Sequence, residues 1–258
     1  MSKNDNLVIN IKDLSKVYDG QQGKTVALST VNLQIYKGDF VVLLGPSGCG
    51  KTTLLNIIAG YNKPTSGQAL MHSKEIVGPG KDRGVVFQST NLYPWLSVRE
   101  NIEYGLKLHK LDKDKIKELS DMFLNKIELL EYENHYPFEL SGGMKQRVAL
   151  VRTLINNPEI LLMDEPFGAL DAMTRVNMQR LLRDLWHEGD QTFFLITHDI
   201  DEALFLGSRV LVMSKDSGQI IKEYKLDYKD KVADGDDYVT ATSPKYLKIK
   251  KEILELIA

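Results

Sequence analysis

Residues 45–52 read GPSGCGKT, a glycine-rich run that ends in a lysine and a threonine. Glycines let a backbone curl tightly, so that successive N–H groups point inward at one anion. In this pattern the Lys51 ammonium reaches the β- and γ-phosphates of a nucleotide, and the Thr52 hydroxyl ligates Mg²⁺. The expected nucleotide contacts are Gly45, Pro46, Ser47, Gly48, Cys49, Gly50, Lys51, Thr52 and Thr53.

The residues on either side of this run supply the structural context that the pattern requires. Residues 39–45 (DFVVLLG) are typical of a strand buried on both faces of a parallel sheet. Residues 52–60 (TTLLNIIAG) read as a helix, whose N-terminal dipole would favour the same anion. A glycine-rich turn with a chance lysine is the plain alternative, and the two flanking elements argue against it.

A second group of reactive side chains follows the apolar run ILLM, residues 160–163. Asp164 would lie at the carboxyl end of a buried strand, where open α/β sheets bind ligands. There it would hold Mg²⁺ through water, and Glu165 would accept a proton from an attacking water. Two solvated acids at a strand end are the alternative, and the phosphate loop is what favours the catalytic interpretation.

Several elements must position these groups. Similar apolar runs recur at 84–87, 160–164 and 192–197 with helical stretches between them, which predicts an α/β core with a parallel sheet. Residues 8–11 and 31–36 alternate apolar and polar side chains, as half-buried strands do. The opening part of the chain is therefore predicted to be β-rich.

The middle and the end of the chain show helical patterns. Residues 112–130 are predicted to form an amphipathic helix. Its apolar positions are Ile116, Leu119, Met122, Phe123, Ile127 and Leu130. No buried-strand run interrupts residues 89–150, which predicts a helical subdomain inserted between core strands. Residues 226–240 read as a polar surface segment, and residues 243–257 as a final amphipathic helix.

LSGGM, residues 140–144, lies between the predicted helical subdomain and the aspartate strand. It resembles LSGGQ, the signature of the ABC (ATP-binding cassette) ATPase family, and the resemblance extends over roughly residues 7–215. It implies an α/β fold with a phosphate-loop NTPase (RecA-like) core, an N-terminal antiparallel β part and an inserted α-helical subdomain. The implied single domain divides into a core (1–88 and 151–215), a helical subdomain (89–150) and a C-terminal tail (216–258).

The resemblance also implies a homodimer that sandwiches ATP. In the family the signature caps the γ-phosphate of ATP bound to the opposite subunit, a role that falls here on Ser141, Gly142 and Gly143. A serine hydroxyl, glycine N–H groups and a helix N-terminus suit an anion. Met144 stands where the signature usually has glutamine. Without the family resemblance, the alternative interpretation of residues 140–144 is a Gly-Gly turn before a helix.

Other family positions fall in order along the chain. Tyr18 resembles the aromatic residue that stacks on adenine, although an isolated tyrosine is more often a packing or surface residue. Gln88 resembles the glutamine that contacts Mg²⁺ and senses the membrane partner, and GALD (168–171) resembles the D-loop. His198 resembles the switch histidine near the γ-phosphate. With ATP and Mg²⁺ as cofactors, the implied catalytic residues are Glu165, His198 and Lys51, and the implied metal ligands are Thr52, Gln88 and Asp164.

Composition restricts the setting. Hydrophobic residues make up 43% of the 258, charged residues 26%, and the net charge is −2, so nothing points to nucleic acid as a partner. Cys49 is the single cysteine, which excludes an internal disulfide. The longest apolar runs, such as 40–44, are far shorter than the ~20 residues that a membrane-spanning helix needs. We expect a peripheral protein at the cytoplasmic face of the membrane.

A finer resemblance concerns the transported solute. Residues 78–88, 91–106 and 163–175 resemble the ATPase subunits of nitrate-, sulfonate- and taurine-type importers. This implies separate transmembrane permease subunits and, indirectly, a solute-binding protein. Pro94 and Trp95 lie where the family docks a helix of the membrane subunit, and core packing is the alternative for Trp95. Related importers also carry pyrimidine precursors or bicarbonate.

Two other classes of protein compete with this interpretation. A soluble ABC ATPase of DNA repair or translation usually has two cassettes or a long coiled coil, and this chain has one cassette and no sustained heptads. A GTPase should carry an Asn-Lys-x-Asp motif. The two Asn-Lys pairs continue as NKPT (62–65) and NKIE (125–128), so that motif is missing.

Overall fold

The computed structural model describes residues 6–20, 23–168, 170–189, 191–215, 218–226 and 243–257. The chain folds as two compact units, Met1–Gly80 with Thr192–Ala258, and Lys81–Gln191. We call them the first and the second unit. The first unit contains the phosphate loop and His198, and the second contains Gln88, the signature and the acid pair. The functional division at residues 89 and 150 stays a prediction.

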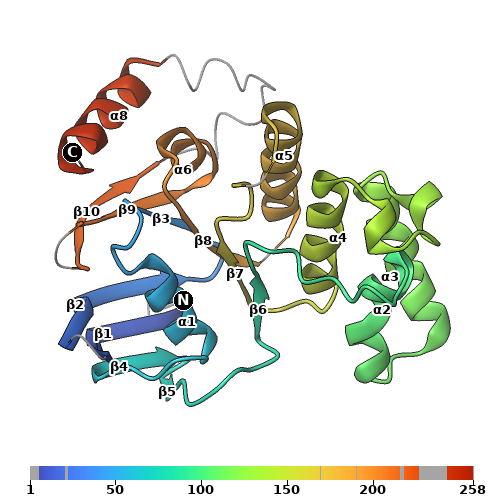
Figure 1. The fold of residues 1–258 in the computed structure, drawn as a ribbon, viewed down its shortest axis with the longest axis horizontal. Coiled ribbons are helices and arrows are strands. Elements are labelled where there is room, and N and C mark those ends of the chain that lie inside the picture. Colours follow the sequence, from blue (N-terminus) through green and yellow to red (C-terminus); the bar gives the residue numbers. More distant parts are fainter. Residues whose placement is uncertain are drawn as a thin grey trace. The chain divides into compact units, whose positions relative to one another are not determined.

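The first unit opens with an antiparallel sheet of order β2-β1-β4-β5 (Figure 1). Its strands are β1 (Leu7–Gly20), β2 (Gly23–Tyr36), β4 (Ser66–Met71) and β5 (Lys74–Glu75). Along β2 the residues from 31 to 35 alternate between buried and exposed, as the sequence pattern predicts, and Tyr36 is half-buried. The expected N-terminal antiparallel part is confirmed.

The first unit also contains strands in the order β10-β9-β3-β8. β3 pairs in parallel with β8 and β9, and β10 joins β9 antiparallel. The strands are β3 (Phe40–Leu44), β8 (Thr192–Thr197), β9 (Arg209–Met213) and β10 (Ile220–Lys225). The unit's helices are α1 (Lys51–Ala59), α6 (Ile200–Leu206) and α8 (Pro244–Ile257). β3 and β8 are buried along their whole length, which explains their unbroken apolar sequences.

The second unit combines one parallel strand pair with helices (Figure 1). The strands are β6 (Arg83–Val86) and β7 (Ile160–Asp164). The helices are α2 (Val98–Leu108), α3 (Lys113–Lys126), α4 (Gly142–Leu154) and α5 (Ala172–Glu188), with 3₁₀ turns at Leu130–Tyr132 and Pro137–Glu139. Between residues 89 and 150 the described structure is helical or irregular, as expected from the sequence.

A buried apolar cluster holds the helices of the second unit together. It includes Val98, Ile102, Leu106, Ile116, Leu124, Ile127, Leu129, Leu140, Val148, Val151 and Ile155. The expectation that Met122 and Leu130 belong to the apolar face of a helix over 112–130 was wrong, because both side chains are substantially exposed. α3 ends at Lys126, and its buried face runs through Ile116, Ser120 and Leu124. Leu130 therefore lies beyond the helix and no longer follows its period.

Short polar side chains cap the N-termini of several helices. Asp112 caps α3, Ser141 caps α4, Asp171 caps α5 and Asp199 caps α6, each by accepting from a backbone N–H of the first turn. At α2, Ser97 and Glu100 form a reciprocal capping box. These caps fix the first turn of α4, which contains site residues described below, and the first turn of α6, which closely follows one.

The last part of the chain was predicted to contain a polar segment and a helix. The C-terminal helix expected at 243–257 is present as α8. The polar segment expected at 226–240 lies outside the described residues except for Leu226, which is buried. No helix among the described residues combines the length and the apolar character needed to cross a membrane.

Candidate nucleotide-binding site

The phosphate loop connects β3 to α1 in the first unit. β3 ends at Leu44, and Gly50 in the left-handed conformation (φ 104°) precedes the first turn of α1. Gly48 also has a positive φ, 82°. Only glycine adopts such angles without strain. The loop therefore has the tight backbone path that the sequence pattern predicts.

Two of the loop glycines are required by close packing as well as by conformation. A Cβ atom on Gly50 would lie 2.3 Å from the carbonyl oxygen of Ala27, and one on Gly45 would lie 2.8 Å from Cys49 Sγ. At Gly48 a Cβ would meet nothing within 4 Å. The loop is therefore packed against protein at Gly45 and Gly50 and open at Gly48. The open side is where an anion could reach the backbone N–H groups.

Lys51 is the charged residue of the loop. Its side chain is 5% exposed, and Nζ donates to the carbonyl oxygens of Gly45 (2.8 Å) and Pro46 (2.9 Å). These bonds fold the ammonium group back over the loop that it follows in sequence. Thr52 is exposed and Thr53 is half-buried in the first turn of α1. The Lys51 ammonium is thus held in the loop, where phosphate oxygens could replace the two carbonyls as acceptors.

Cys49 lies inside the loop and is buried. Burial raises the pKa of its thiol, and this outweighs the lowering effect of the nearby Lys51 charge and of backbone hydrogen bonds. A thiol with a raised pKa carries little thiolate at neutral pH and is a poor nucleophile. We therefore assign Cys49 to packing of the loop, in keeping with a site built from backbone N–H groups.

His198 lies at the same sheet edge as the phosphate loop. β3 and β8 are parallel with Leu44 opposite Thr197, and the next residues along the two strands are Gly45 and His198. The Gly45 N–H donates to the Thr197 carbonyl oxygen at 3.3 Å. His198 itself is exposed. Strand register therefore brings two groups 153 positions apart in sequence to one edge.

Tyr18 lies on β1 with its ring partly exposed. Asn62 Nδ2 donates to its hydroxyl (3.2 Å), and Lys16 Nζ lies 5.0 Å from the ring centroid. Lys16 Nζ also donates to the Lys63 carbonyl oxygen (2.8 Å), so both contacts tie the tyrosine to the chain that follows α1. The Lys16 ammonium lies over one face of this partly exposed ring, so a base could stack only on the other face.

The acid pair and Gln88 lie together in the second unit. Val86 pairs with Met163, so Gln88 and Glu165 each follow their strand two residues beyond the last pair. Both side chains approach Gly168. A Cβ atom placed on Gly168 would lie 3.8 Å from Gln88 Nε2 and 3.9 Å from Glu165 Oε2. Asp164 ends β7 and is half-buried. The expectation that Asp164 closes a buried parallel strand is confirmed.

Glu165 has an unusual backbone conformation. Its φ is 42°, which is a left-handed value. This conformation is strained for any residue that has a Cβ atom, and Pro166 follows it. Strained conformations of this kind cluster at functional sites. The turn ends the strand abruptly and directs the Glu165 side chain toward Gly168 and Gln88.

The signature residues form the start of α4. Ser141 is the N-cap, and its Oγ accepts from the Met144 N–H at 3.3 Å. Gly142 has nothing within 4 Å of its ideal Cβ position, whereas a Cβ on Gly143 would lie 2.3 Å from Thr174 Cγ2. Met144 packs against the apolar cluster. The departure from the family signature at Met144 therefore concerns packing in the helical core.

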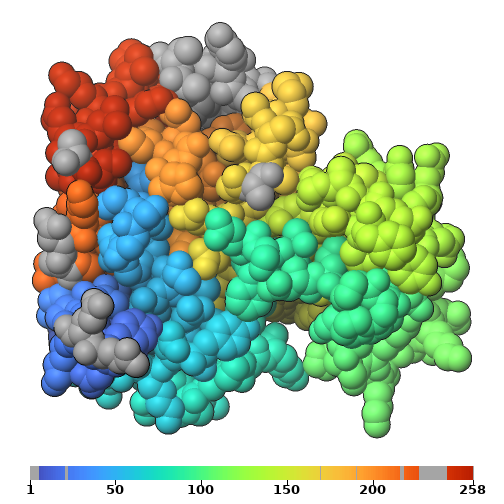
Figure 2. Space-filling view, in the orientation of Figure 1, coloured from blue at the N-terminus to red at the C-terminus, as the bar shows by residue number. Residues whose placement is uncertain are grey.

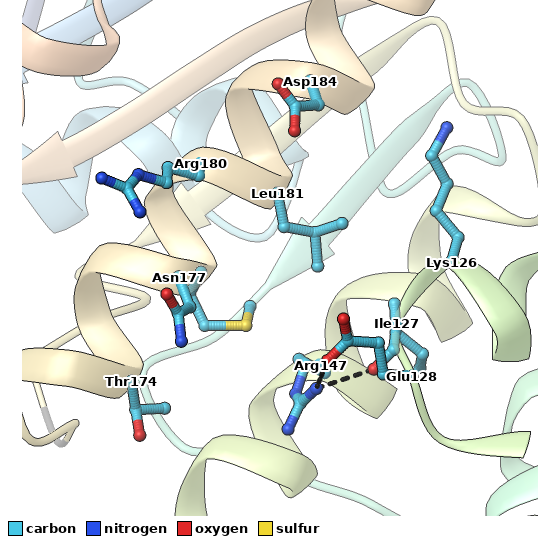
Figure 3. Close-up of a pocket in the computed structure, with 10 residues that line it drawn as sticks. Lys126, Ile127, Glu128, Arg147, Thr174, Asn177, Arg180, Leu181 and Asp184 are labelled. Atoms are coloured by element: carbon cyan, nitrogen blue, oxygen red, sulfur yellow. Dashed lines mark hydrogen bonds and ion pairs between the residues drawn. The ribbon is translucent and has the colours of Figure 1, made fainter. Parts of the chain in front are cut away.

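A pocket of about 400 Å³ lies beside the signature helix (Figure 3). Thr174 and Asn177 on α5 line it together with Arg147 on α4, and Leu181 points into it. Arg147 Nη1 donates to the Ile127 carbonyl oxygen at the end of α3 (2.7 Å). The arginine thus ties α4 to α3 at the edge of this pocket.

The segment after Gln88 carries an exposed aromatic group. Trp95 is 70% exposed, so the alternative that it packs in the core was wrong. Its ring lies 5.6 Å from the ring of Tyr93, which in turn lies 4.7 Å from that of Tyr104. Pro94 is exposed as well. These residues form an aromatic surface, which we define as Tyr93, Pro94, Trp95 and Tyr104.

Sequence reasoning missed the residues that shape this segment. The Asn101 side chain is fully buried, accepts from the Tyr93 N–H (2.9 Å) and donates to the carbonyl oxygens of Tyr93, Leu96 and Ser97. Arg152 donates to the carbonyl oxygens of Asn91 (2.8 Å) and Thr90 (3.2 Å). An asparagine beside apolar residues in the segment predicted to be helical was the available signal, because buried polar groups need partners.

Thr52, Gln88 and Asp164 have side chains that suit Mg²⁺, since a hydroxyl, an amide and a carboxylate are all hard oxygen donors. Thr52 is exposed at the start of α1, directly after the loop that is open at Gly48. Mg²⁺ is commonly bound through one or two carboxylates together with substrate phosphates. Each of the three side chains is therefore of a type that fits the metal.

A glycine-rich loop between a buried parallel strand and a helix, with an acid at the end of another buried strand, defines the class of phosphate-loop NTPases. Within that class, the profile of the family described as ABC transporter matches residues 28–168. The chain belongs to this family, and the expected fold and family are confirmed.

Individual relatives agree with this assignment. The taurine import ATP-binding protein TauB of Pelagibacter ubique (strain HTCC1062) is 46% identical over 95% of this chain and 93% of its own length. The nitrate import ATP-binding protein NrtD of Synechocystis sp. (strain ATCC 27184 / PCC 6803 / Kazusa) is 41% identical over 96% and 94%. An ATP-binding cassette solved as a dimer in a post-hydrolysis state with ADP and Pi has a TM-score of 0.74 and 37% identity, covering 84% of this chain and 98% of that one.

Proposed function

We propose that this chain is the ATP-binding and ATP-hydrolysing subunit of an ABC importer, working as a homodimer on the cytoplasmic face of separate permease subunits. The observation that carries the proposal is the phosphate loop, with Lys51 Nζ held over it and its open side at Gly48. Similarity to taurine and nitrate import ATP-binding proteins over nearly the whole chain supports the importer class. Taurine- or nitrate-like solutes are the corresponding substrates of the transporter.

The residues have distinct roles in the proposed reaction. Loop N–H groups and Lys51 hold the phosphates, and Tyr18 offers a ring face to the adenine. Thr52, Gln88 and Asp164 would hold Mg²⁺, which would supply positive charge to the phosphates when bound. Glu165 accepts the proton of the attacking water, and His198 lies at the γ-phosphate edge. Ser141, Gly142 and Gly143 contact the γ-phosphate of ATP bound to the second subunit.

The aromatic surface is proposed to contact a permease subunit. Exposed aromatic side chains are costly in water and are enriched at interfaces. Most of this surface, Tyr93 to Trp95, lies a few residues after Gln88 in the chain, and the ring of Tyr104 packs against that of Tyr93. A permease contact on this surface would therefore be linked through the backbone to Gln88, a residue of the nucleotide site. This connection would transmit ATP binding to the membrane partner, which in turn contacts a solute-binding protein.

The test of the proposal uses Glu165→Gln, which keeps the shape of the side chain but cannot accept a proton. ATP should then bind without being hydrolysed and hold two subunits together, because bound ligand adds its binding free energy to the dimer. We would measure turnover and the elution volume on a sizing column with and without ATP. A Glu165→Gln protein that hydrolyses ATP at the normal rate and remains monomeric would remove Glu165 as the base.

A further inference from the structure

The C-terminal helix α8 packs against α6 and β9 in the first unit (Figure 1). In the space-filling view its red atoms lie against the orange atoms of that unit (Figure 2). Ile253 of α8 is fully buried and Tyr246 is nearly so. The Tyr224 hydroxyl of β10 donates to Glu252 Oε2 at 3.2 Å. α8 is therefore anchored by apolar and polar contacts.

One carboxylate receives two donors from this helix. Asp201 Oδ1 accepts from the Tyr246 hydroxyl (2.7 Å) and from Lys250 Nζ (2.6 Å), and Oδ2 also accepts from Lys250 Nζ (2.8 Å). Burial raises the pKa of Asp201, but hydrogen bonds from Lys250 and Tyr246 and the charge of Lys250 outweigh it, so that its pKa is lowered. The carboxylate is thus stabilised in its ionised form by α8.

Asp201 lies in the first turn of α6, three residues after His198. Between them, Asp199 accepts from the Glu202 N–H (3.1 Å) as the cap of α6, and the Asp199 N–H donates to Thr197 Oγ1 (3.1 Å). In the chain, His198 thus lies between the last residue of β8 and the cap of α6. A shift of the first turn of α6 would move the backbone that carries His198.

We propose that α8 positions His198, and that Asp201 is the positioning residue through which Tyr246 and Lys250 act. The inference rests on the proposed function, in which His198 lies at the γ-phosphate. The Asp201 side chain is 61% exposed, and exposed ion pairs contribute little to global stability. The contact of Asp201 with Tyr246 and Lys250 therefore acts mainly on the position of the first turn of α6, and through it on turnover.

The experiment compares Asp201→Asn, Tyr246→Phe and Lys250→Met in the full chain, with Lys248→Met as the matched control. Lys248 is an exposed lysine on the same helix. We expect the three variants to lower kcat for ATP by about three- to tenfold, which is within the range of coupling between contacting side chains, with KM changed less than about twofold. Lys250→Arg should keep kcat, because arginine can donate to the same carboxylate. Lys248→Met should match the unaltered protein.

A double-mutant cycle with His198→Ala separates positioning from general stability. If Asp201 acts through His198, Asp201→Asn should change kcat less than about twofold in the His198→Ala background. Single-turnover hydrolysis with excess protein keeps this slow background measurable. Equal fractional losses in both backgrounds, or losses that track a lowered Tm, would overturn the inference. If His198→Ala alone keeps full turnover, the role of His198 in the proposed function fails, and positioning through it fails as well.

Discussion

The N–H of Gly45 donates to the carbonyl oxygen of Thr197 at 3.3 Å, which joins the first residue of the phosphate loop to the residue before His198. The bond continues the parallel pairing of β3 and β8 one step beyond the strands. It explains how a loop and a histidine far apart in sequence reach one sheet edge.

Lys51→Ala should nearly abolish hydrolysis and weaken ATP binding. The ammonium is the charge that the loop holds with the Gly45 and Pro46 carbonyls, and phosphate oxygens are its expected acceptors. Loss of one such preorganised donor typically lowers turnover by about 100- to 1,000-fold. ATP affinity by calorimetry and turnover by phosphate release provide the check. Near-normal turnover would contradict the phosphate-loop assignment.

Gly142→Asp should leave ATP binding to a single subunit intact but stop hydrolysis. The new carboxylate would face the γ-phosphate of the other subunit, and like charges repel. The site has open space for a side chain, and an acid in the first turn suits the helix dipole of α4. Turnover and ATP affinity are measured on the same protein. An equal fall in both would mean that the signature acts within its own chain.

Gly143 tests packing at the adjacent position. A Cβ there would lie 2.3 Å from Thr174 Cγ2, so Gly143→Ala should lower the free energy of unfolding by about 1–3 kcal/mol. Adding Thr174→Ser removes that methyl group and should restore part of the loss. Gly142→Ala, in open space, is the matched control and should not destabilise. The free energy of unfolding in urea is measured for the parent, the two single variants and the double variant. A Gly143→Ala protein as stable as its parent would refute the close contact. The same clash makes Gly143→Asp a poorer probe of charge than Gly142→Asp.

Trp95→Ala should reduce transport by the assembled complex more than it reduces ATPase activity of the isolated subunit. The side chain is 70% exposed, so its removal leaves no cavity and Tm should be unchanged. Transport in vesicles containing the complex, ATPase activity of the subunit and thermal unfolding are compared. Ile102→Ala, at a fully buried position of the same unit, is a control that should lower Tm. Equal loss of transport and activity in Trp95→Ala would argue against a permease contact.

Cys49 should react slowly with a maleimide. Its burial raises the pKa of the thiol, so the reactive thiolate is scarce near neutral pH and increases only as pH rises toward that pKa. As the single cysteine, it can be followed by mass spectrometry of the whole chain. We expect alkylation at least about tenfold slower than in urea, and slower still with ATP. Equal rates in the folded and unfolded chains would show that the loop does not shield the thiol.

The sequence by itself determined the elements with strong local signals. The phosphate loop is specified by glycines and a lysine within eight residues, and the buried strands by unbroken apolar runs. Asp164 and His198 were placed correctly at strand ends because a strand's end is visible in its own residues. The family followed from LSGGM and the order of the motifs.

Only the tertiary structure decided which distant groups meet. The pairing of Leu44 with Thr197 and the approach of Gln88 and Glu165 to Gly168 depend on strand register, which no local pattern records. The contact of Gly143 with Thr174 and of Asp201 with α8 depends on how helices pack. The amphipathic period also failed where α3 ended, since Leu130 lies beyond it. Local propensity acts over a few residues, whereas these contacts arise from packing between segments far apart in the chain.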